Sequence, residues 1–456
     1  MVWFSDLSKE LILLIWDLVE LEDIYSFSTV TKEVYLLTYE LLREHFRLKK
    51  RLTIISNVGL KPGEHGVFGR ILKEVLLNPQ AALYPSILKV DIGEVESGER
   101  GEHFHGTVSE SDLELFKQVI RDTTNESEED MEEFWLADID EGREEPLVAL
   151  LLLLLPNLRE IDFGTYLTGS LCMNIALRTI MDDENSCPLR KLRSVNLRCT
   201  GNDDDDMLDF ELVRLFAILP SVTSIYGYNV GSYPDDLPQN SIYTFEKTNV
   251  TDLTFVQCRI DPKSMFEFLS TTENLQIFFY SPRGDSRIFD PFWIRTALLA
   301  NARYTLKALT ILADGYPRSF IGSLEEFYYL ESVKMDVWLL IADPPTWSHK
   351  PSTILPSSIV NIMIHIKHLS DRECCRASIR DIADRPTHFE SLKTIVVVCA
   401  AGIPASSIFN ETVSLVLKGR GVRLSFATED EPDDAEIDFD GESHTSSISQ
   451  ALQTSS

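Results

Sequence analysis

Few basic residues, no ordered cysteine pattern and no membrane-length apolar run are present in this sequence, and each shortage excludes a class of protein. The 456 residues include 42 Lys and Arg against 72 Asp and Glu, a formal charge of −30. Nucleic acid phosphates and anionic membrane surfaces both require clustered Lys and Arg, so we expect neither as a partner. Seven scattered cysteines without a C-x-x-C pair favour a reducing compartment, which is the cytoplasm, the nucleus or both.

The apolar run Leu147–Leu155 stops at Pro156, whereas a membrane span needs about 20 apolar residues. We expect it to form a buried helix that begins at Pro146. The N-terminus lacks the basic stretch of a targeting segment, and acidic residues such as Glu10 interrupt its apolar residues.

Motifs of catalysis are also missing, since there is no G-x-S-x-G, G-x-x-x-x-G-K-[ST] or H-E-x-x-H. His103 and His105 beside Glu102 could ligate a metal, and the acidic run Asp203–Asp206 could attract a cation. Neither group has the ligand spacing of a protein metal site. We therefore expect a chain that is not an enzyme, with no catalytic residues, no metal and no cofactor.

What the sequence does contain, between Leu7 and Leu37, is a pattern of three short amphipathic helices. Three- and four-residue steps place one set of apolar residues on one face of a first helix: Leu7, Leu11, Leu14, Ile15 and Leu18. A second helix carries Ile24, Phe27 and Val30, and a third carries Val34, Leu37 and Leu41 before a basic stretch. Ser8, Asp23 and Thr31 are the predicted N-caps.

This segment resembles an F-box, a family with the approximate pattern Leu-Pro-x-Glu, an apolar run, Ile-x-x-x-Leu, Asp-Leu, and Val-x-Lys or Val-x-Arg before an aromatic and a Leu. Leu36 fits its end; Ser8 stands where the family has Pro, and Val34 where it often has Trp. The resemblance implies docking to the Skp-type adaptor of an SCF-type cullin–RING ubiquitin ligase, and through it to a cullin. The adaptor-binding residues that it implies are Leu7, Glu10, Leu11, Ile15, Leu18, Asp23, Ile24, Val30 and Lys32. The alternative is the start of an ordinary helical domain.

Two later stretches, Leu72–Pro85 and Pro146–Phe163, resemble segments of a group of F-box proteins from filamentous fungi. This second resemblance implies a fungal F-box protein, and it names no substrate.

From residue 87 onward a short pattern recurs, in which apolar residues stand at the first, fourth and often sixth positions. Its copies begin at Ile87, Leu158, Leu192, Val222, Val250, Leu275, Leu306, Leu330, Ile359 and Leu392. From Leu158 on, the spacing averages about 29 residues, at the top of the range of leucine-rich repeats. Helical stretches are predicted between copies at 210–219, 263–269, 293–299 and 323–329.

This spacing predicts an irregular leucine-rich-repeat-like α/β solenoid, or horseshoe, with parallel strands on one side and helices on the other. The Asn or Cys that normally follows the strand pattern is mostly absent. A plain α/β domain with several strands remains the alternative.

Acidic residues gather in two places, an insertion at about 93–145 with nineteen Asp or Glu against four Lys or Arg, and a tail at 428–456 with nine and none. Within the insertion, Asp112–Arg121 has helical spacing, whereas Asn125–Glu133 is typical of a solvated loop. The tail has a disorder composition. The domains are therefore predicted as an F-box-like helical domain (1–50), a repeat region (51–427) and a disordered acidic tail (428–456).

These features predict the substrate-recognition subunit of an SCF-type ubiquitin ligase, whose repeats bind a protein substrate. Tyr226, Tyr228, Tyr280 and Trp338, near strand ends, are possible substrate contacts, although such aromatics are more often core. Two alternatives stay open: a repeat-type interaction scaffold independent of any ligase, and an enzyme with its site in the repeats or the insertion.

Overall fold

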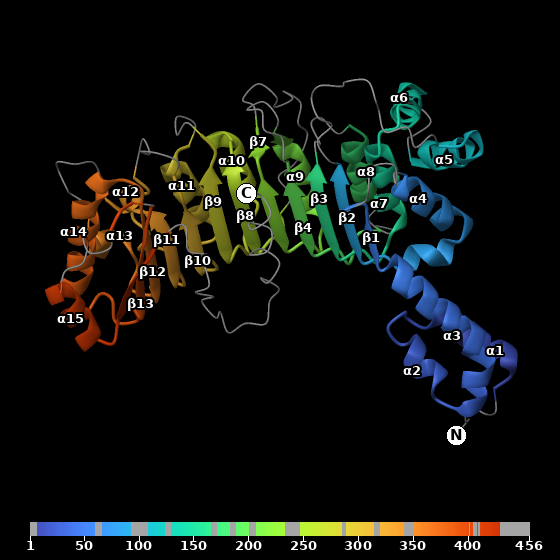
Figure 1. Ribbon diagram of the computed structural model, residues 1–456, viewed down its shortest axis with the longest axis horizontal. Helices are drawn as coiled ribbons and strands as arrows, with labels where there is room; N and C mark the ends of the chain where they lie inside the picture. The colour runs from blue at the N-terminus through green and yellow to red at the C-terminus, as the bar shows by residue number, and fades with distance from the viewer. Residues whose placement is uncertain are drawn as a thin grey trace. The chain divides into compact units, whose positions relative to one another are not determined.

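Figure 1 shows the computed structural model, in which strands and helices alternate along most of the chain. The fold is mixed α/β with parallel strands. The chain divides into two compact units, Met1–Gly284 (unit 1) and Asp285–Ser456 (unit 2), and the division falls inside the predicted repeat region. The structure describes residues 7–428 except 60–65, 93–107, 124–128, 166–170, 183–187, 200–206, 233–246, 285–288, 314–319, 342–349, 401, 405–407 and 409–410.

The three predicted N-terminal helices are present as α1 (Lys9–Leu18), α2 (Ile24–Ser28) and α3 (Lys32–Leu52). The side-chain oxygens of Ser8 and Thr31 accept hydrogen bonds from the backbone N–H groups of Leu11 and Val34, at 3.4 and 3.2 Å, which confirms both as N-caps. The expectation for Asp23 is wrong. Its backbone has helical angles (φ −96°, ψ −8°) and its side chain makes no cap hydrogen bond, whereas a capping residue needs an extended backbone.

The sheet of unit 1 is built from parallel strands that pair in the order in which they follow along the chain. It contains β1 (Ile54–Ser56), β2 (Ile87–Ile92), β3 (Glu160–Thr165), β4 (Ser194–Arg198), β6 (Ser224–Tyr228), β8 (Asp252–Cys258) and β9 (Ile277–Pro282). A separate parallel pair is formed by β5 (Leu208–Asp209) and β7 (Val230–Gly231).

The strands of unit 2 follow the same rule. They are β10 (Ala308–Ile311), β11 (Ser332–Asp336), β12 (Asn361–Ile366), β13 (Thr394–Cys399) and β14 (Arg423–Thr428). All ten predicted copies of the repeat therefore contain a strand, while β1 and β14 extend the series beyond the predicted copies. Parallel neighbours in chain order fit a repeat solenoid, and the curvature of a horseshoe stays a prediction.

Helices connect most of these strands. In unit 1 they are α4 (Val67–Leu77), the 3-10 helix η2 (Pro79–Leu83), α7 (Glu145–Leu154), α8 (Leu171–Asp182), α9 (Phe210–Ile218) and α10 (Pro262–Leu269). In unit 2 they are α11 (Pro291–Asn301), α12 (Val337–Leu340), α13 (Pro351–Ile354), η3 (Leu369–Asp371), α14 (Arg372–Asp384) and α15 (Glu411–Gly419). Pro146 stands in the first turn of α7, as predicted.

Three of the four helices predicted between copies are confirmed, and the one at 323–329 is wrong. That segment runs as successive turns, in which the Phe327 N–H donates to the Leu324 carbonyl and the Leu330 N–H to the Phe327 carbonyl. Leu324, Phe327 and Leu330 are fully buried. Their three-residue spacing looks helical in sequence, but here it comes from turns.

The core of unit 1 lies between its strands and its helices. Side chains alternate along each strand, so Phe163 and Phe255 are buried while their neighbours point the other way. Phe255 contacts Phe210 of α9 and Phe268 of α10, with ring centroids 6.0 and 6.5 Å apart. Cys258 occupies the position where leucine-rich repeats carry Asn or Cys, and its thiol accepts from the Val230 N–H at 3.4 Å.

The acidic insertion is more ordered than predicted. It contains α5 (Glu110–Thr123), as expected for 112–121, and also α6 (Glu129–Asp140), where a solvated loop was predicted. Apolar residues four apart bury themselves in both helices: Phe116 with Ile120, and Trp135 with Ile139. Burial of these side chains stabilises both helices despite the acidic composition of the insertion. Residues 125–128, and the tail from residue 429, lie outside the described residues.

Over the described ranges, no helix combines the length and apolar character needed to cross a membrane.

Candidate interaction surfaces

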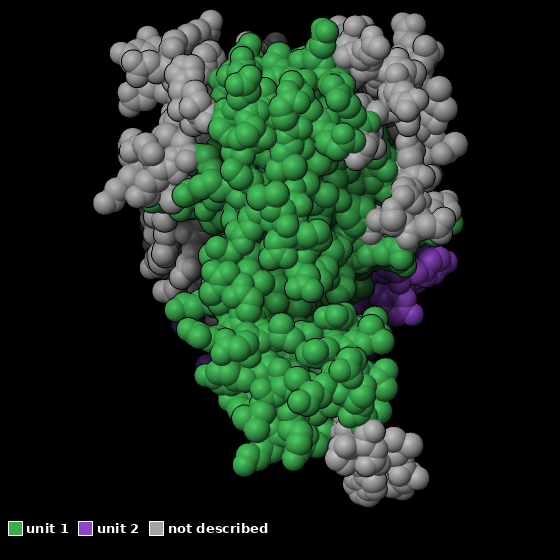
Figure 2. All heavy atoms as spheres, turned by 90° about the vertical axis from the view of Figure 1, so that its right-hand side faces the viewer, with its two compact units in different colours: residues 1–284 green, residues 285–456 purple. Residues whose placement is uncertain are grey.

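Exposed apolar side chains gather on residues 7–52, here called the three-helix segment, which forms the lower part of the unit 1 surface in Figure 2. Among the described residues 25 large hydrophobic side chains are exposed, and ten of them lie in this segment. They are Leu11, Leu14, Leu18, Tyr25, Val30, Tyr35, Leu36, Tyr39, Leu41 and Phe46. An apolar concentration of this kind marks an interaction site more often than scattered single residues do.

Helix α1 shows why these residues stay exposed. Its core-facing side chains are Ile12 and Trp16, which join Ile24, Phe27, Val34 and Leu42 in one cluster. Leu11, Leu14 and Leu18, here called the α1 leucine stripe, are 47, 57 and 78 % exposed. Their three- and four-residue spacing places them together on another side of the helix. The apolar face predicted from the sequence is therefore mostly exposed, because the small core buries only the side chains at the edge of that face.

The nine predicted adaptor-binding residues divide into three groups by burial. Those exposed in the structure are Glu10, Leu11, Leu18, Asp23, Val30 and Lys32, whereas Leu7 and Ile15 are half-buried against the core. Ile24 is only 4 % exposed, so it cannot contact a partner directly and can only pack beneath the residues that do. Hydrogen bonds from its own backbone N–H and from the Ser8 hydroxyl lower the pKa of Glu10, which keeps an ionised carboxylate beside the stripe.

Four exposed aromatics on α2 and α3 were not among the predicted binding residues. Tyr25 and Phe46 lie 6.1 Å apart between ring centroids, and Tyr35 and Tyr39 lie 5.8 Å apart. The signal was available in the sequence, since α3 carries more apolar positions than one core-facing stripe can hold. The F-box pattern fixes only some of those positions.

The end of α3 packs on the first repeats of unit 1. Leu48, Leu52 and Ala81 form a buried cluster, with Ile71 and Tyr84 against it. Next to it a ring nitrogen of His45 lies 3.2 Å from the Tyr84 hydroxyl, and burial lowers the pKa of His45. Through these contacts, the C-terminal end of α3 packs directly against the core of the first repeats.

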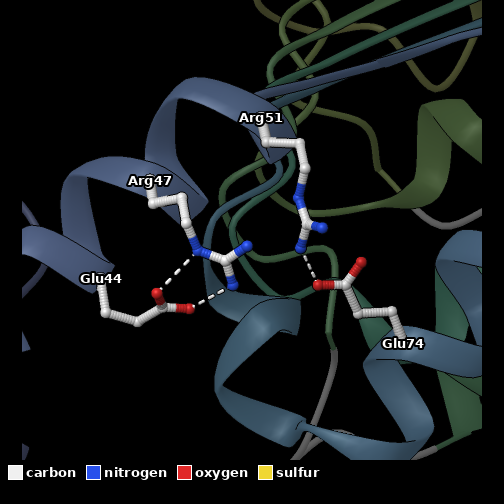
Figure 3. A network of polar contacts seen from close by, with 4 residues as sticks. All are labelled: Glu44, Arg47, Arg51 and Glu74. Atoms are coloured by element: carbon white, nitrogen blue, oxygen red, sulfur yellow. Dashed lines mark hydrogen bonds and ion pairs between the residues drawn. The ribbon is translucent and has the colours of Figure 1, made fainter.

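Ion pairs surround this junction. Figure 3 shows Arg47 bound to Glu44 on the same helix, at 2.7 and 2.6 Å, and Arg51 bound to Glu74 of α4. Arg159 pairs with Glu22 at 2.6 Å. Except for the half-buried Glu74, these side chains are exposed, so each pair stabilises the junction only weakly. The buried apolar cluster contributes most of the stability of the junction.

The second candidate surface is the side of the unit 1 sheet that faces away from its helices, here called the strand face. Tyr226 and Tyr228 lie on it, half-buried, as two of the possible substrate contacts. Tyr280 is only 2 % exposed and belongs to the core, which excludes it as a substrate contact. Trp338 is half-buried in α12 of unit 2. Beside Tyr226, Arg198 donates two hydrogen bonds to Asp162.

Within the described ranges, no group of three or more His, Cys, Asp or Glu side chains lies close enough together to hold a metal ion. His103, His105 and Asp203–Asp206 lie outside those ranges. Glu145, at the start of α7, is largely buried, and burial raises its pKa to about 7 while the Met173 N–H donates to it at 3.3 Å. Burial, and then Lys334 and Lys367, lower the pKa of His365 to about 3.

Comparison with known proteins leaves the family of this chain open. No protein-family model and no curated protein matches it. Among solved structures it is similar to a chain of the crystal structure of the Rad7 and Elc1 complex in yeast, with 12 % sequence identity, 61 % of this chain and 77 % of that chain covered, and a TM-score of 0.21. A TM-score of this size supports no inference about fold or function.

Proposed function

We propose that the chain is the substrate-recognition subunit of an SCF-type cullin–RING ubiquitin ligase. The three-helix segment docks a Skp-type adaptor, and through it a cullin, while the repeat strands bind a protein substrate. The observation that carries this proposal is the exposed α1 leucine stripe, together with the other exposed apolar residues of a segment that resembles an F-box. A small helical unit that leaves this much apolar surface uncovered gains stability when a partner buries it.

The mechanism is docking followed by proximity. A few central apolar side chains carry most of the energy of such an interface, and Leu11, Leu14 and Leu18 are the most exposed candidates on α1. Catalysis belongs to the ligase partners, so this chain contributes effective concentration of the substrate near the charged ubiquitin carrier. In this role it needs no catalytic residue, cofactor or metal of its own, and it acts in the cytoplasm, the nucleus or both.

The test is co-purification with a Skp-type adaptor, comparing the intact chain with a Leu11→Asp, Leu18→Asp double variant. Both side chains are exposed, so the fold stays intact while two charges enter the docking surface. Two central anchors worth about 2 kcal/mol each would weaken binding by several hundred-fold or more. Ile15 is unsuitable for this test because it packs against the core of the segment.

A matched control carries the same two changes elsewhere. Leu77 on α4 and Leu415 on α15 are 67 and 64 % exposed, and a Leu77→Asp, Leu415→Asp variant adds the same charge far from α1 in sequence. Adaptor capture by the intact chain and the control, but not by the α1 variant, supports the proposal. Failure of the intact chain to capture any adaptor refutes it and favours the free-standing scaffold.

A further inference from the structure

The strand face of unit 1 displays its side chains in straight rows, because adjacent strands pair in register. One row runs Asp91, Gly164, Arg198 and Tyr228 across β2, β3, β4 and β6. The row beside it runs Lys89, Asp162, Asn196, Tyr226, Thr254 and Phe279. Within these two rows, the charged residues lie on β2–β4, here called the charged half, and the aromatic residues lie from β6 onward, here called the aromatic half.

The charged half is organised around Gly164. Arg198 reaches over this glycine and donates from Nε and Nη2 to the same oxygen of Asp162, at 3.2 and 2.8 Å. A Cβ at position 164 would lie 3.6 Å from Arg198 Nη2 and 3.6 Å from Asp91 Oδ1. Asp91 and Arg198 therefore both reach the space above Gly164 of β3, each within ordinary contact distance of that position. Because both bonds use Oδ1, the second oxygen of Asp162 can accept from a further donor as far as the described residues are concerned.

The aromatic half is also fixed before any partner arrives. The Tyr228 hydroxyl donates to Gln257 Oε1 at 2.8 Å, and Gln257 is held by a bulge of β8 with φ 51°. Burial raises the pKa of Tyr226 to about 12, so its hydroxyl stays neutral. Fixed Tyr and Arg side chains are typical interface anchors, because little conformational entropy is lost when they bind.

Charge and spacing indicate the occupant. The outward side chains of β2–β9 include the four carboxylates of Asp91, Glu160, Asp162 and Asp252, against Lys89 and Arg198. Asp91 and Tyr228 are three strand spacings apart, which is about 14 Å. An extended peptide advances about 3.3 Å per residue, so side chains four residues apart point the same way about 13 Å apart.

We propose that the strand face binds an extended segment of the substrate protein that carries a Lys or Arg four residues from an aromatic or aliphatic residue. The cationic side chain binds Asp91 and the second oxygen of Asp162, and the apolar side chain packs on Tyr226 and Tyr228. This inference rests on the proposed function, since it names the substrate segment that the ligase subunit would recognise.

The test is selection of binders by the full chain from a display library of random eleven-residue peptides. We expect the selected peptides to be enriched at least ~5-fold in pairs of a basic and an apolar residue four positions apart. An Asp91→Lys variant should shift the charged preference toward Asp or Glu, and Tyr228→Ala should abolish the apolar preference. Arg423→Glu, an exposed charge reversal on β14, serves as the control and should select the same peptides as the unmodified chain.

Selection of acidic or random peptides by the unmodified chain overturns the proposal, and so does a preference that Asp91→Lys and Tyr228→Ala leave unchanged. Circular dichroism of each variant separates loss of binding from loss of fold. Adaptor capture is measured on α1 and peptide selection on the strand face, so either can fail alone. Selection without adaptor capture leaves a peptide-binding scaffold, whereas capture without selection leaves a ligase subunit with a different substrate surface.

Discussion

The three-helix segment and the repeat sheet use apolar residues in opposite ways. Strands of the sheet hide them, as Val195, Leu197 and Ile225 show at 0–1 % exposure. In the three-helix segment, leucines with equally regular spacing stay 47–78 % exposed on α1. Spacing alone therefore predicts which side chains share a face. Whether that face becomes core depends on how much neighbouring structure is there to cover it.

Size explains the difference. Each repeat buries its strand and helix against the repeats before and after it, so its apolar side chains are covered from several directions. The three-helix segment has its own cluster of six buried residues and one neighbour, the first repeats beyond the end of α3. A unit that small cannot enclose every apolar face it carries. The predictions that follow test this contrast, beginning with the repeat core.

The largest effect is expected for Phe255→Ala in the repeat core. Phe255 is fully buried and touches aromatic rings of α9, α10 and β9. Removing the ring should lower the free energy of unfolding by about 3–5 kcal/mol, because the lost burial and the remaining cavity both destabilise the fold. Urea unfolding of the intact chain, followed by circular dichroism, measures the change.

Val256→Ala, one residue further along β8 on the strand face, is the matched control for that experiment. Its side chain is half-buried, so a loss below about 1 kcal/mol is expected. Equal losses at the two positions would show that the sheet buries both of its faces alike.

The next largest effect concerns pH and Glu145. Its folded pKa of about 7 lies above the ordinary value of 4.5, so between these values the unfolded chain ionises first and the folded state loses stability as pH rises. The loss is complete above pH 7 and amounts to at most about 3 kcal/mol. Glu145→Gln removes this titration while keeping an acceptor for the Met173 N–H.

Urea titrations at pH 5 and pH 8 measure this effect. The variant should gain stability at pH 8 relative to the original chain and lose most of that advantage at pH 5. Parallel pH curves for the two proteins would mean that Glu145 is already ionised in the folded state at neutral pH.

The repeat architecture could be predicted because each copy repeats the same local pattern and few competing patterns occur within it. All ten copies form strands, and the buried helix predicted to begin at Pro146 begins one residue earlier, at Glu145. The segment 323–329 could not be recognised, because buried residues at three-residue spacing are shared by helices and by successive turns. In the acidic insertion, the helix that carries Phe116 and Ile120 was predicted from its spacing, whereas the acidic composition concealed the pair Trp135–Ile139 of α6.

The candidate surfaces were less predictable, because burial depends on neighbours that the sequence does not show. The F-box pattern names Ile24, which the structure buries, and omits Leu14, which is 57 % exposed. The charged half of the strand face depends on register, since only strand pairing brings Asp91, Gly164 and Arg198 into one row. Asp23 failed as a cap because its backbone continues in helical angles, a local choice that residue type does not decide.

A smaller effect distinguishes Thr31, which caps its helix, from Asp23, which was predicted to cap and does not. Thr31→Ala should cost about 1 kcal/mol of helix stability, because its hydroxyl accepts from the Val34 N–H at 3.2 Å. Asp23→Ala should change almost nothing, since its side chain makes no cap hydrogen bond. Amide hydrogen exchange in the first turns of α2 and α3 measures both changes locally. Faster exchange in α2 after Asp23→Ala would contradict the structure of that helix start.

A small effect on stability is expected together with a clear effect on binding at Leu14 of the α1 leucine stripe. Leu14→Ala removes a 57 % exposed side chain, so the free energy of unfolding should change by no more than about 0.5 kcal/mol. If the α1 leucine stripe is a docking surface, the same change should weaken adaptor capture by at least tenfold, because interface anchors lose more than 1 kcal/mol on truncation. Trp16→Ala, on the core side of the same helix, is expected to show the reverse order, with loss of fold first. If Leu14→Ala destabilises the chain as much as Trp16→Ala does, the stripe is part of the core and the contrast between the two regions disappears.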